Sequence, residues 1–360
     1  MGIDSSKYYL RPFGLVEKKI GKNLFKTKKA ISVNSRFFCC IELIVRKKKI
    51  IKKVFTVNEF FEFVKIENNI KINKLLNQLT NPKKNFLNNK RFFSKNQNHA
   101  IFGILNITPD SFSDGGENQK LNIALEKAIK MTKDGADFID IGGESTRPGA
   151  KRVDPALECL RILPVVQVLD EKNLNLSLDT RNSQTMKLGI LNGINIINDV
   201  SALKNDKKSI EVLKKYKLPL ILMHMPGTPK TMMKKNNYKN VVLDVYDFLE
   251  ERIKFCESNG LSKENIIVDP GIGFGKDHQQ NLELLQNLSI FHTLGCSVML
   301  GVSRKRFISE FSNSVNPKER LGGTISATLS AAKQGIEIHR VHDVKEVRQA
   351  LNIFEKVNSI

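Results

Sequence analysis

The sequence predicts an α/β protein, a (β/α)8 TIM barrel with a small basic N-terminal extension. From Ile101 onward, short apolar runs alternate about eight times with helix-length amphipathic stretches. An array of about 260 residues has the length of such a barrel. An open doubly wound sheet would alternate in the same way. Polar residues follow nearly every apolar run, which favours the barrel because barrel active sites form at the carboxyl ends of the strands.

The individual elements of the barrel follow from these periodicities. The predicted strands are Ile101–Asn106, Phe138–Gly142, Leu174–Asp179, Asn195–Asn198, Leu218–Met223, Ile266–Asp269, Ser297–Val302 and Glu337–Val341. The predicted helices are Leu121–Lys133, Pro155–Leu169, Ser183–Leu191, Val241–Asn259, Asn281–Phe291 and Leu321–Gln334. We therefore assign residues 99–360 to the barrel.

The first part of the chain has a different composition. Residues 1–98 carry 23 Lys or Arg and 6 Asp or Glu, a net charge of +17 out of +21 for the whole chain. The pattern of apolar residues predicts a strand at Phe37–Val45 and one or two helices within Asn58–Leu79. We assign residues 1–80 to a small basic extension of unknown role and the Asn- and Lys-rich residues 81–98 to a linker.

The basic charge raises the hypothesis of a nucleic-acid-binding extension. Lys, Asn and Ile are, however, enriched along the entire chain, and no RNA-binding motif interleaves aromatic with basic residues. Compositional bias is the preferred explanation, and we expect no nucleic-acid partner.

The sequence also bears on location. No apolar run approaches the roughly 18 residues of a membrane span, and the first ten residues lack the apolar core of a signal peptide. The five cysteines form no CxxC pair, which favours reduced, buried thiols over disulfides or metal ligands. We expect a cytoplasmic protein without a membrane partner.

Two polar segments carry the strongest chemical signals. Residues 106–116 place an amide, hydroxyls and carboxylates directly after a strand. These groups can supply metal or phosphate ligands, although a capped turn uses the same residue types. Residues 140–149 place two glycines before Arg147, whose planar cation suits a carboxylate or a phosphate.

These two segments resemble the signature loops of the dihydropteroate synthases. Further matches lie at the ends of the other strands, at residues 177–180, 197–200, 222–227, 269–276, 301–305 and 339–344. The resemblance implies a homodimeric transferase of folate biosynthesis. Such enzymes condense 6-hydroxymethyl-7,8-dihydropterin diphosphate with p-aminobenzoate and release diphosphate.

The resemblance also implies a pterin site. Asp179, Asn198 and Asp269 would pair with the hydrogen-bonding edge of the pterin. Met223 and Phe274 would sandwich its faces.

A second implied site holds the diphosphate. Arg340 and His342 alternate along one strand and therefore point to the same side. Together with Thr146 they would bind the diphosphate. Asn106 would coordinate the cofactor Mg²⁺. Asp140 would assist the metal site indirectly, without binding the ion itself.

The resemblance completes the set of site residues. The implied catalytic residues are Asp110, Thr146, Arg147, Lys305, Arg340 and His342. The implied substrate-binding residues are Thr146, Asp179, Asn198, Met223, Asp269, Phe274, Ser303, Lys305, Arg340, His342, Ser111, Phe112 and Pro148. The two signature loops would close over p-aminobenzoate and exclude water. For Lys305, a buried structural salt bridge is the alternative role.

Two other functions compete with this interpretation. A corrinoid-linked methyltransferase component has a similar pterin-binding barrel, but it should lack the diphosphate and p-aminobenzoate loops. A catalytically inactive pterin-binding protein with a nucleic-acid-binding extension would use the barrel and the basic segment differently. The two loops favour the synthase.

Overall fold

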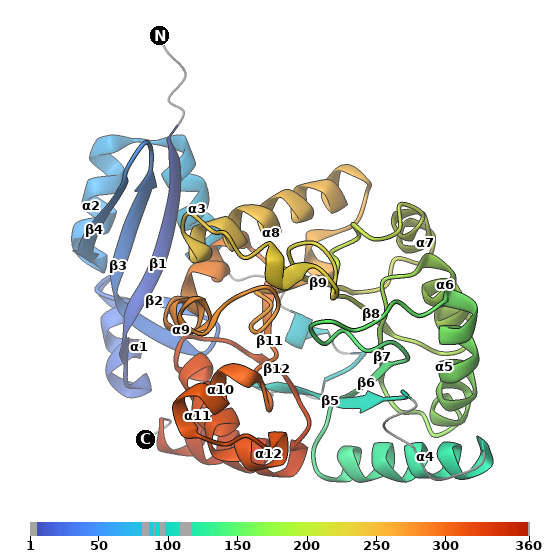
Figure 1. Cartoon of the computed structure of the whole chain (residues 1–360). Helices are drawn as coiled ribbons and strands as arrows, with labels where there is room; N and C mark the ends of the chain where they lie inside the picture. The colour runs from blue at the N-terminus through green and yellow to red at the C-terminus, as the bar shows by residue number, and fades with distance from the viewer. Residues whose placement is uncertain (1–5, 81–85, 90, 94–97, 109–116, 359–360) are drawn as a thin grey trace.

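The computed structural model describes residues 6–80, 86–89, 91–93, 98–108 and 117–358. Eight parallel strands close into a barrel in the order β10-β11-β12-β5-β6-β7-β8-β9 (Figure 1). These strands are β5 (Ala100–Asn106), β6 (Phe138–Gly142), β7 (Leu176–Asp179), β8 (Ile196–Asp199), β9 (Leu220–Met223), β10 (Ile266–Asp269), β11 (Ser297–Leu300) and β12 (Ile338–Val341). The predicted (β/α)8 TIM barrel is confirmed.

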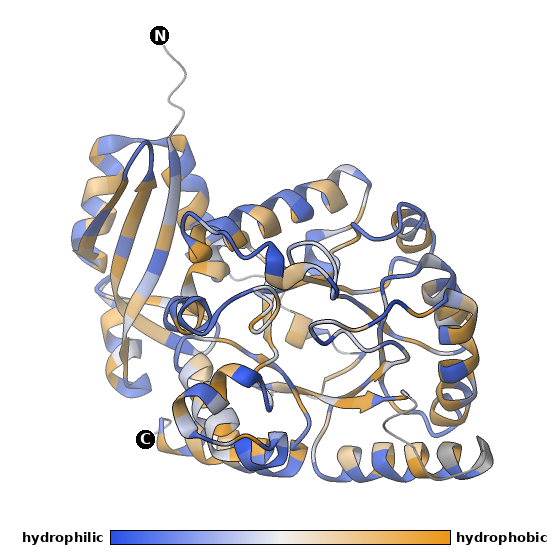
Figure 2. Cartoon of the chain, in the orientation of Figure 1, coloured by the Kyte–Doolittle hydropathy of each residue, from blue (hydrophilic) through white to orange (hydrophobic). Residues whose placement is uncertain are grey.

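Helices surround the barrel. They are α4 (Glu117–Lys133), α5 (Pro155–Asp170), α6 (Ser183–Leu191), α7 (Ser209–Tyr216), α8 (Val241–Ser258), α9 (His278–Gln286), α10 (Arg306–Ser312), α11 (Leu321–Lys333) and α12 (Val344–Val357), with the 3-10 helices η3 (Met232–Lys234), η4 (Lys263–Asn265), η5 (Leu288–Leu294) and η6 (Pro317–Arg320). Hydrophobic and hydrophilic residues interleave along them (Figure 2), as expected when one face of each helix is buried. In the described ranges, no helix is both long and apolar enough to cross a membrane.

One predicted helix is wrong. The sequence predicts a continuous helix over Asn281–Phe291, whereas α9 ends at Gln286 and η5 begins at Leu288. The side-chain amide of Asn287, between them, donates to the carbonyl of Glu283 at 2.8 Å. Every residue of η5 is buried, so its apolar residues reflect burial on all sides and not one face of a longer helix.

The barrel interior has two layers because alternate strand residues point inward. The layer at the N-terminal ends of the strands is apolar. It consists of Ala100, Phe102, Phe138, Ile196, Ile221, Ile267, Met299 and Ile338. At the C-terminal ends, the same alternation brings polar side chains together. These are Asp140, Ser177, Asp179, Asn198, Asp269 and Arg340. The fold therefore concentrates polar groups at one end of the barrel.

The described part of residues 81–98 packs against the other end. It includes η1 (Phe86–Asn88). Phe86, Leu87 and Phe93 join the apolar interior layer, and the Phe86 N–H donates to Ser297 Oγ at 3.2 Å. Because Ser297 is the first residue of β11, this segment covers the N-terminal ends of the strands.

Residues 6–80 form an antiparallel sheet with three helices (Figure 1). The elements are β1 (Lys7–Val16), α1 (Lys18–Lys26), β2 (Ile31–Val33), β3 (Arg36–Arg46), β4 (Ile50–Thr56), α2 (Val57–Glu67) and α3 (Ile70–Thr80). Strand β1 pairs along one edge of β3, and β2 and β4 pair with it as well. The sheet, α2 and α3 share their own apolar core. The predicted strand is confirmed, and the segment predicted to hold one or two helices holds two, α2 and α3.

The N-terminal sheet packs against the outside of the barrel (Figure 1). Tyr9 of β1 is fully buried and belongs to the main barrel core. Ser289 of η5 donates to the carbonyl of Pro12 at 2.6 Å. Arg36 of β3 donates to the carbonyl of Ala332 at 3.1 Å. Apolar burial and polar contacts thus join the sheet to the helices outside β9 to β12.

A polar cluster at this interface predicts a pH-dependent stability. Glu355 of α12 lies 2.8 Å from His99 Nε2 and forms an ion pair with Arg36. Burial alone would raise the pKa of Glu355, but the hydrogen bonds with His99 and Arg36 outweigh it and lower the pKa to about 2. This stabilisation is complete above the ordinary pKa of 4.5 and is lost as the pH falls toward the folded-state value.

We expect Glu355→Gln to lower the free energy of unfolding by about 2 kcal/mol at neutral pH. The variant should also lose part of the fall in stability seen in acid. Denaturant titrations at several pH values check this, with the exposed Glu67→Gln as the matched control. Equal acid slopes for the parent and the Glu355 variant would contradict the prediction.

Candidate active site

Asp140 of β6 is the centre of a buried network at the C-terminal end of the barrel. Its side chain is fully buried. It accepts hydrogen bonds from Ser177 Oγ at 2.5 Å, Asn198 Nδ2 at 3.1 Å and Arg340 Nε at 2.6 Å. These partners come from β7, β8 and β12, so inward side chains of separate strands converge here. Asp140 thereby fixes the orientation of Asn198 and Arg340.

Asp179 of β7 provides an open acceptor beside this network. Its Oδ2 accepts from Arg340 Nη2 at 2.9 Å, whereas its buried Oδ1 has no hydrogen-bond partner among the described residues. Burial raises the pKa of Asp179, against the opposing charge of Arg340 and with the help of the negative charge of Asp140. Such an oxygen suits an N–H donor of a bound heterocycle.

Asp269 and Lys305 face the same space from β10 and from the segment after β11. A Cβ atom on Gly301 would lie 3.8 Å from Lys305 Nζ and 3.9 Å from Asp269 Oδ2. The other carboxylate oxygen, Oδ1, accepts from the Gly271 N–H at 2.7 Å. Burial raises the pKa of Asp269, and the charge of Lys305 opposes this shift. The site therefore combines a carboxylate acceptor with an ammonium donor.

Lys305 is held by the loop that follows β10. Its Nζ donates to the carbonyl of Ile272 and lies 4.5 Å from the ring centroid of Phe274. Burial lowers the pKa of Lys305 to about 8; the charge of Asp269 opposes this shift and that of Arg340 adds to it. Lys305 is thus a cationic donor that loses its proton at mildly alkaline pH.

Met223 and Phe274 form an apolar wall of the same site. They belong to one cluster, which also contains Val200, Met225 and Met232. Met223 is buried and Phe274 is partly exposed. The structure thus brings the two predicted residues together and leaves the Phe274 ring accessible beside Lys305.

His342 lies directly after β12. Both its backbone N–H and its Nδ1 approach Ser303 Oγ, at 3.1 and 3.0 Å. Burial lowers the pKa of His342 to about 3, and the positive charges of Arg340 and Arg304 lower it further. The imidazole is therefore neutral near pH 7 and can form hydrogen bonds, whereas the neighbouring Arg340 carries a positive charge.

The loop between β6 and α5 carries three of the predicted residues, Thr146, Arg147 and Pro148. Arg147 and Pro148 are exposed and Thr146 is partly exposed. At the base of the loop, buried Glu144 accepts two hydrogen bonds of 2.9 Å from Arg181. At its tip, the Gly149 N–H donates to the carbonyl of Pro229 at 3.0 Å. The loop is thus held at Glu144 and at Gly149, and it presents residues 146–148 between these two points.

Asn106 ends β5 close to Asp179. A Cβ atom on Gly142 would lie 3.5 Å from Asn106 Oδ1 and 3.8 Å from Asp179 Oδ2. Among the described residues, no group of three or more His, Cys, Asp or Glu could hold a metal ion. One amide oxygen near a carboxylate fits Mg²⁺, which takes few protein ligands and completes its shell with phosphate oxygens and water. The predicted residues Asp110, Ser111 and Phe112 lie outside the described residues.

Lys276 organises the loop after β10, a role that sequence reasoning missed. Its Nζ is 3.0 Å from His224 Nδ1 and donates to the carbonyls of Gly271 and Phe274 at 2.8 and 2.9 Å. Burial lowers the pKa of Lys276 well below its ordinary range. A lysine that directly follows a glycine-rich strand end was the available signal, but its histidine partner comes from another strand end.

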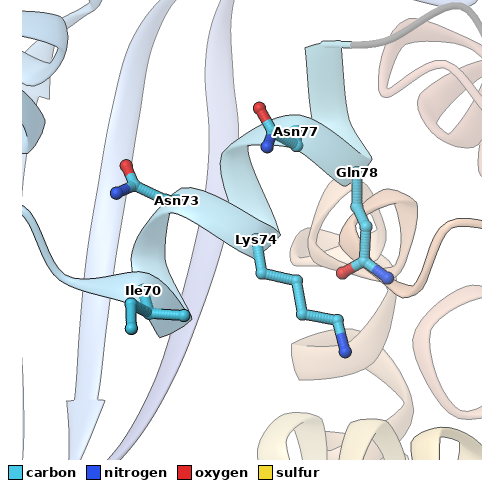
Figure 3. Close-up of a pocket in the computed structure, with 5 residues that line it drawn as sticks. All are labelled: Ile70, Asn73, Lys74, Asn77 and Gln78. Atoms are coloured by element: carbon cyan, nitrogen blue, oxygen red, sulfur yellow. The ribbon is translucent and has the colours of Figure 1, made fainter.

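Two surface hollows lie away from this site. One is an open hollow along α3, lined by Ile70, Asn73, Lys74, Asn77 and Gln78 (Figure 3). The side chains in Figure 3 come from a single helix of the N-terminal part. A second hollow lies at the N-terminal ends of β9 and β10. Both are remote from the polar layer of the barrel.

Comparisons with known proteins agree with this geometry. A family model described as "Pterin binding enzyme" matches residues 102–342. The dihydropteroate synthase of Escherichia coli (strain K12) is 41% identical over 256 residues, which cover 71% of this chain and 90% of the relative.

Solved structures of two Xanthomonas albilineans complexes are also similar. The dihydropteroate synthase with 4-aminobenzoic acid has a TM-score of 0.69 and 38% identity, and the match covers 74% of this chain and 94% of that one. The complex with 7,8-dihydropteroate has a TM-score of 0.67 and 35% identity, with 74% and 96% covered.

Proposed function

Because the chain belongs to the pterin-binding enzyme family, as a dihydropteroate synthase, we propose that the polar end of its barrel performs the condensation with the residues described above. In that reaction the C–O bond between the pterin methylene and the diphosphate breaks. A C–N bond to p-aminobenzoate forms, and the aniline nitrogen releases a proton. The convergence of Asp179, Asn198 and Asp269 on the space beside Lys305 carries this proposal.

The pterin would bind by its polar edge inside the barrel. The open oxygen of Asp179 and the carboxylate of Asp269 would accept from its amino and ring N–H groups, and the amide of Asn198 would complete the edge. Lys305 would donate to the ring carbonyl. The ring would rest on Phe274 and Met223. A Xanthomonas albilineans relative bound to 7,8-dihydropteroate supports this substrate class.

The leaving diphosphate needs positive charge and hydrogen-bond donors. Arg340 would provide the charge from its position between Asp140 and Asp179. His342 is neutral and would donate a hydrogen bond, as would the hydroxyl of Thr146. Bound Mg²⁺ would neutralise charge on the diphosphate oxygens. The same positive groups favour departure of the diphosphate with its electron pair.

The p-aminobenzoate would bind at the two loops above the pterin. Arg147 can pair with its carboxylate because the guanidinium is exposed. Pro148 would line the p-aminobenzoate pocket, to which we also assign Asp110, Ser111 and Phe112. A Xanthomonas albilineans relative bound to 4-aminobenzoic acid supports this assignment.

Turnover of the two substrates tests the proposed function. We expect purified protein with Mg²⁺, the dihydropterin diphosphate and p-aminobenzoate to form dihydropteroate and diphosphate in equal amounts. Asn106→Ala should raise the Mg²⁺ concentration needed for half-maximal rate about tenfold, because Mg²⁺ loses its proposed protein ligand. Asn175→Ala is the control, since this amide donates to the carbonyl of Asp137 at 3.2 Å, beside the opposite ends of the strands.

Two outcomes would count against this assignment. Pterin binding without product would indicate a degenerate pterin-binding protein or a methyltransferase component. An unchanged Mg²⁺ requirement in Asn106→Ala would remove this residue from the metal site.

We also propose that the protein forms a homodimer and works in the cytoplasm. Exposed apolar side chains on α10 and α12, Phe311 and Ile353 among them, would be covered in a homodimer. The five cysteines are free thiols, as expected in the cytoplasm. Largely separate apolar cores support residues 1–80 as an added domain and 99–360 as the catalytic barrel. Within the proposed linker, residues 81–98, Phe86, Leu87 and Phe93 pack into the barrel interior.

A further inference from the structure

Helix α8 makes several polar contacts with the N-terminal sheet. Tyr9 packs edge-on against Tyr246 at 5.1 Å between ring centroids, and its hydroxyl donates to Asp247 at 2.9 Å. Lys7 forms ion pairs with Asp247 at 2.6 Å and Glu250 at 2.9 Å. The sheet therefore holds one side of this helix.

Arg46 extends these contacts to the start of the helix. Its Nη2 lies 2.6 Å from Asp244 Oδ1. The other oxygen of Asp244, Oδ2, accepts from the backbone N–H groups of Lys239 and Asn240 at 2.9 and 3.2 Å. Asp244 thus divides its two oxygens between the N-terminal sheet and the segment that leads into α8.

The same segment touches the loop after β10. Tyr238, next to Lys239, donates from its hydroxyl to the carbonyl of Gly275 at 2.9 Å. The carbonyl of Asn236 accepts from Gln280 Nε2 at 3.1 Å. Gly275 follows Phe274 directly, so the segment before α8 contacts the loop that also carries the aromatic wall of the site.

A second contact from α8 reaches this loop. Phe248 packs edge-on against His224 at 4.8 Å. His224 Nδ1 is 3.0 Å from Lys276 Nζ, which also binds the carbonyl of Phe274. Both routes end on residues 271–276, which hold Phe274 and the carbonyl that binds Lys305.

We propose that Arg46 is a positioning residue for the pterin-binding loop, acting through Asp244 and Tyr238 from the N-terminal domain. This inference rests on the proposed function of the loop. The ion pair fixes the segment before α8, and the Tyr238 hydroxyl transmits that position to Gly275. The N-terminal domain then influences the site, because the pterin affinity of the barrel depends on the contact between this domain and α8.

Direct binding of the dihydropterin diphosphate, measured by calorimetry without p-aminobenzoate, tests this role. We expect Arg46→Met to raise the Kd about three- to tenfold and to raise KM for the pterin substrate by a similar factor. KM for p-aminobenzoate should stay the same. Arg46→Lys should recover part of the affinity, since it retains the charge.

Arg36→Met is the matched control. It also removes an arginine that joins the N-terminal sheet to the barrel, but its partners are Glu355 and Ala332, away from α8. We expect it to lower the melting temperature and leave the Kd unchanged. Equal rises in Kd for the two variants would reduce Arg46 to a general docking role and overturn the proposal.

Tyr238→Phe removes only the hydroxyl that reaches Gly275, and it provides the same test if Arg46→Met does not fold. The double variant with Arg46→Met and Tyr238→Phe should bind the dihydropterin diphosphate no more weakly than the single variant with the higher Kd. Both substitutions interrupt the same route of contacts. Additive losses, or an unchanged Kd in Tyr238→Phe, would overturn the proposal. A parent protein that binds the pterin but does not turn over would defeat the proposed function alone.

Discussion

Replacing Arg340 with methionine should lower kcat/KM about a thousandfold and the free energy of unfolding by about 3 kcal/mol. Arg340 is bound to the buried carboxylates of Asp140 and Asp179, at 2.6 and 2.9 Å. Without it, both carboxylates remain buried without their positive partner. In the proposed reaction, the leaving diphosphate would also lose the cation that Arg340 supplies. One substitution therefore affects both stability and turnover.

These two effects can be separated experimentally. Adding Asp179→Asn to Arg340→Met should restore much of the stability, since one buried negative charge is removed, while turnover stays low. Arg348→Met is the control, because Arg348 pairs with Asp137 at 2.6 Å near the opposite end of the strands. It should reduce stability and leave the turnover of folded protein near the parent value. Parent-like kcat/KM in Arg340→Met would refute the assignment of Arg340.

Much of the barrel could be predicted because its strands and helices have different periodicities. Strands β6 and β10 begin and end where predicted, as does α6. Strand β7 begins at Leu176 instead of the predicted Leu174. Leu174 packs against the core from the turn before the strand, where its N–H donates to the Leu169 carbonyl at 3.4 Å. An apolar residue indicates burial, and this one packs inward without joining the sheet.

The N-terminal sheet was harder to predict. Strand β4 was missed because it exposes every residue except Phe55, so no alternation of apolar and polar residues marks it. Strand β1 was also missed, and Pro12 within it argues against a strand by local rules. Tertiary pairing with β3 decides both cases.

The site was predictable to the extent that strand ends carry its residues. Asp179, Asn198 and Asp269 follow the inward alternation of their strands, and the structure brings them together. Contacts between side chains of different loops could not be predicted from the sequence. The pairing of Lys276 with His224 joins positions 52 residues apart, and the contact depends on the closed barrel. The low pKa of His342 likewise depends on burial and on charges from other segments.

Lys305→Met should lower kcat/KM between about a hundred- and a thousandfold and remove the alkaline limb of the pH profile. In the parent, burial lowers the pKa of Lys305 to about 8. Above that pH the side chain becomes a neutral amine and a weaker donor to the pterin carbonyl, so activity should fall. Profiles of kcat/KM against pH for the parent and the variant check this prediction.

Stability should change with pH in the opposite direction. In the unfolded chain the lysine titrates near 10.5, so between about 8 and that value the unfolded state binds more protons at this site, and stability rises with pH. The charge of Arg340 helps to lower the pKa of Lys305. The residual activity of Arg340→Met should therefore fall at a higher alkaline pH than the activity of the parent does. A limb that stays at the same pH in both Lys305→Met and Arg340→Met would assign it to another group.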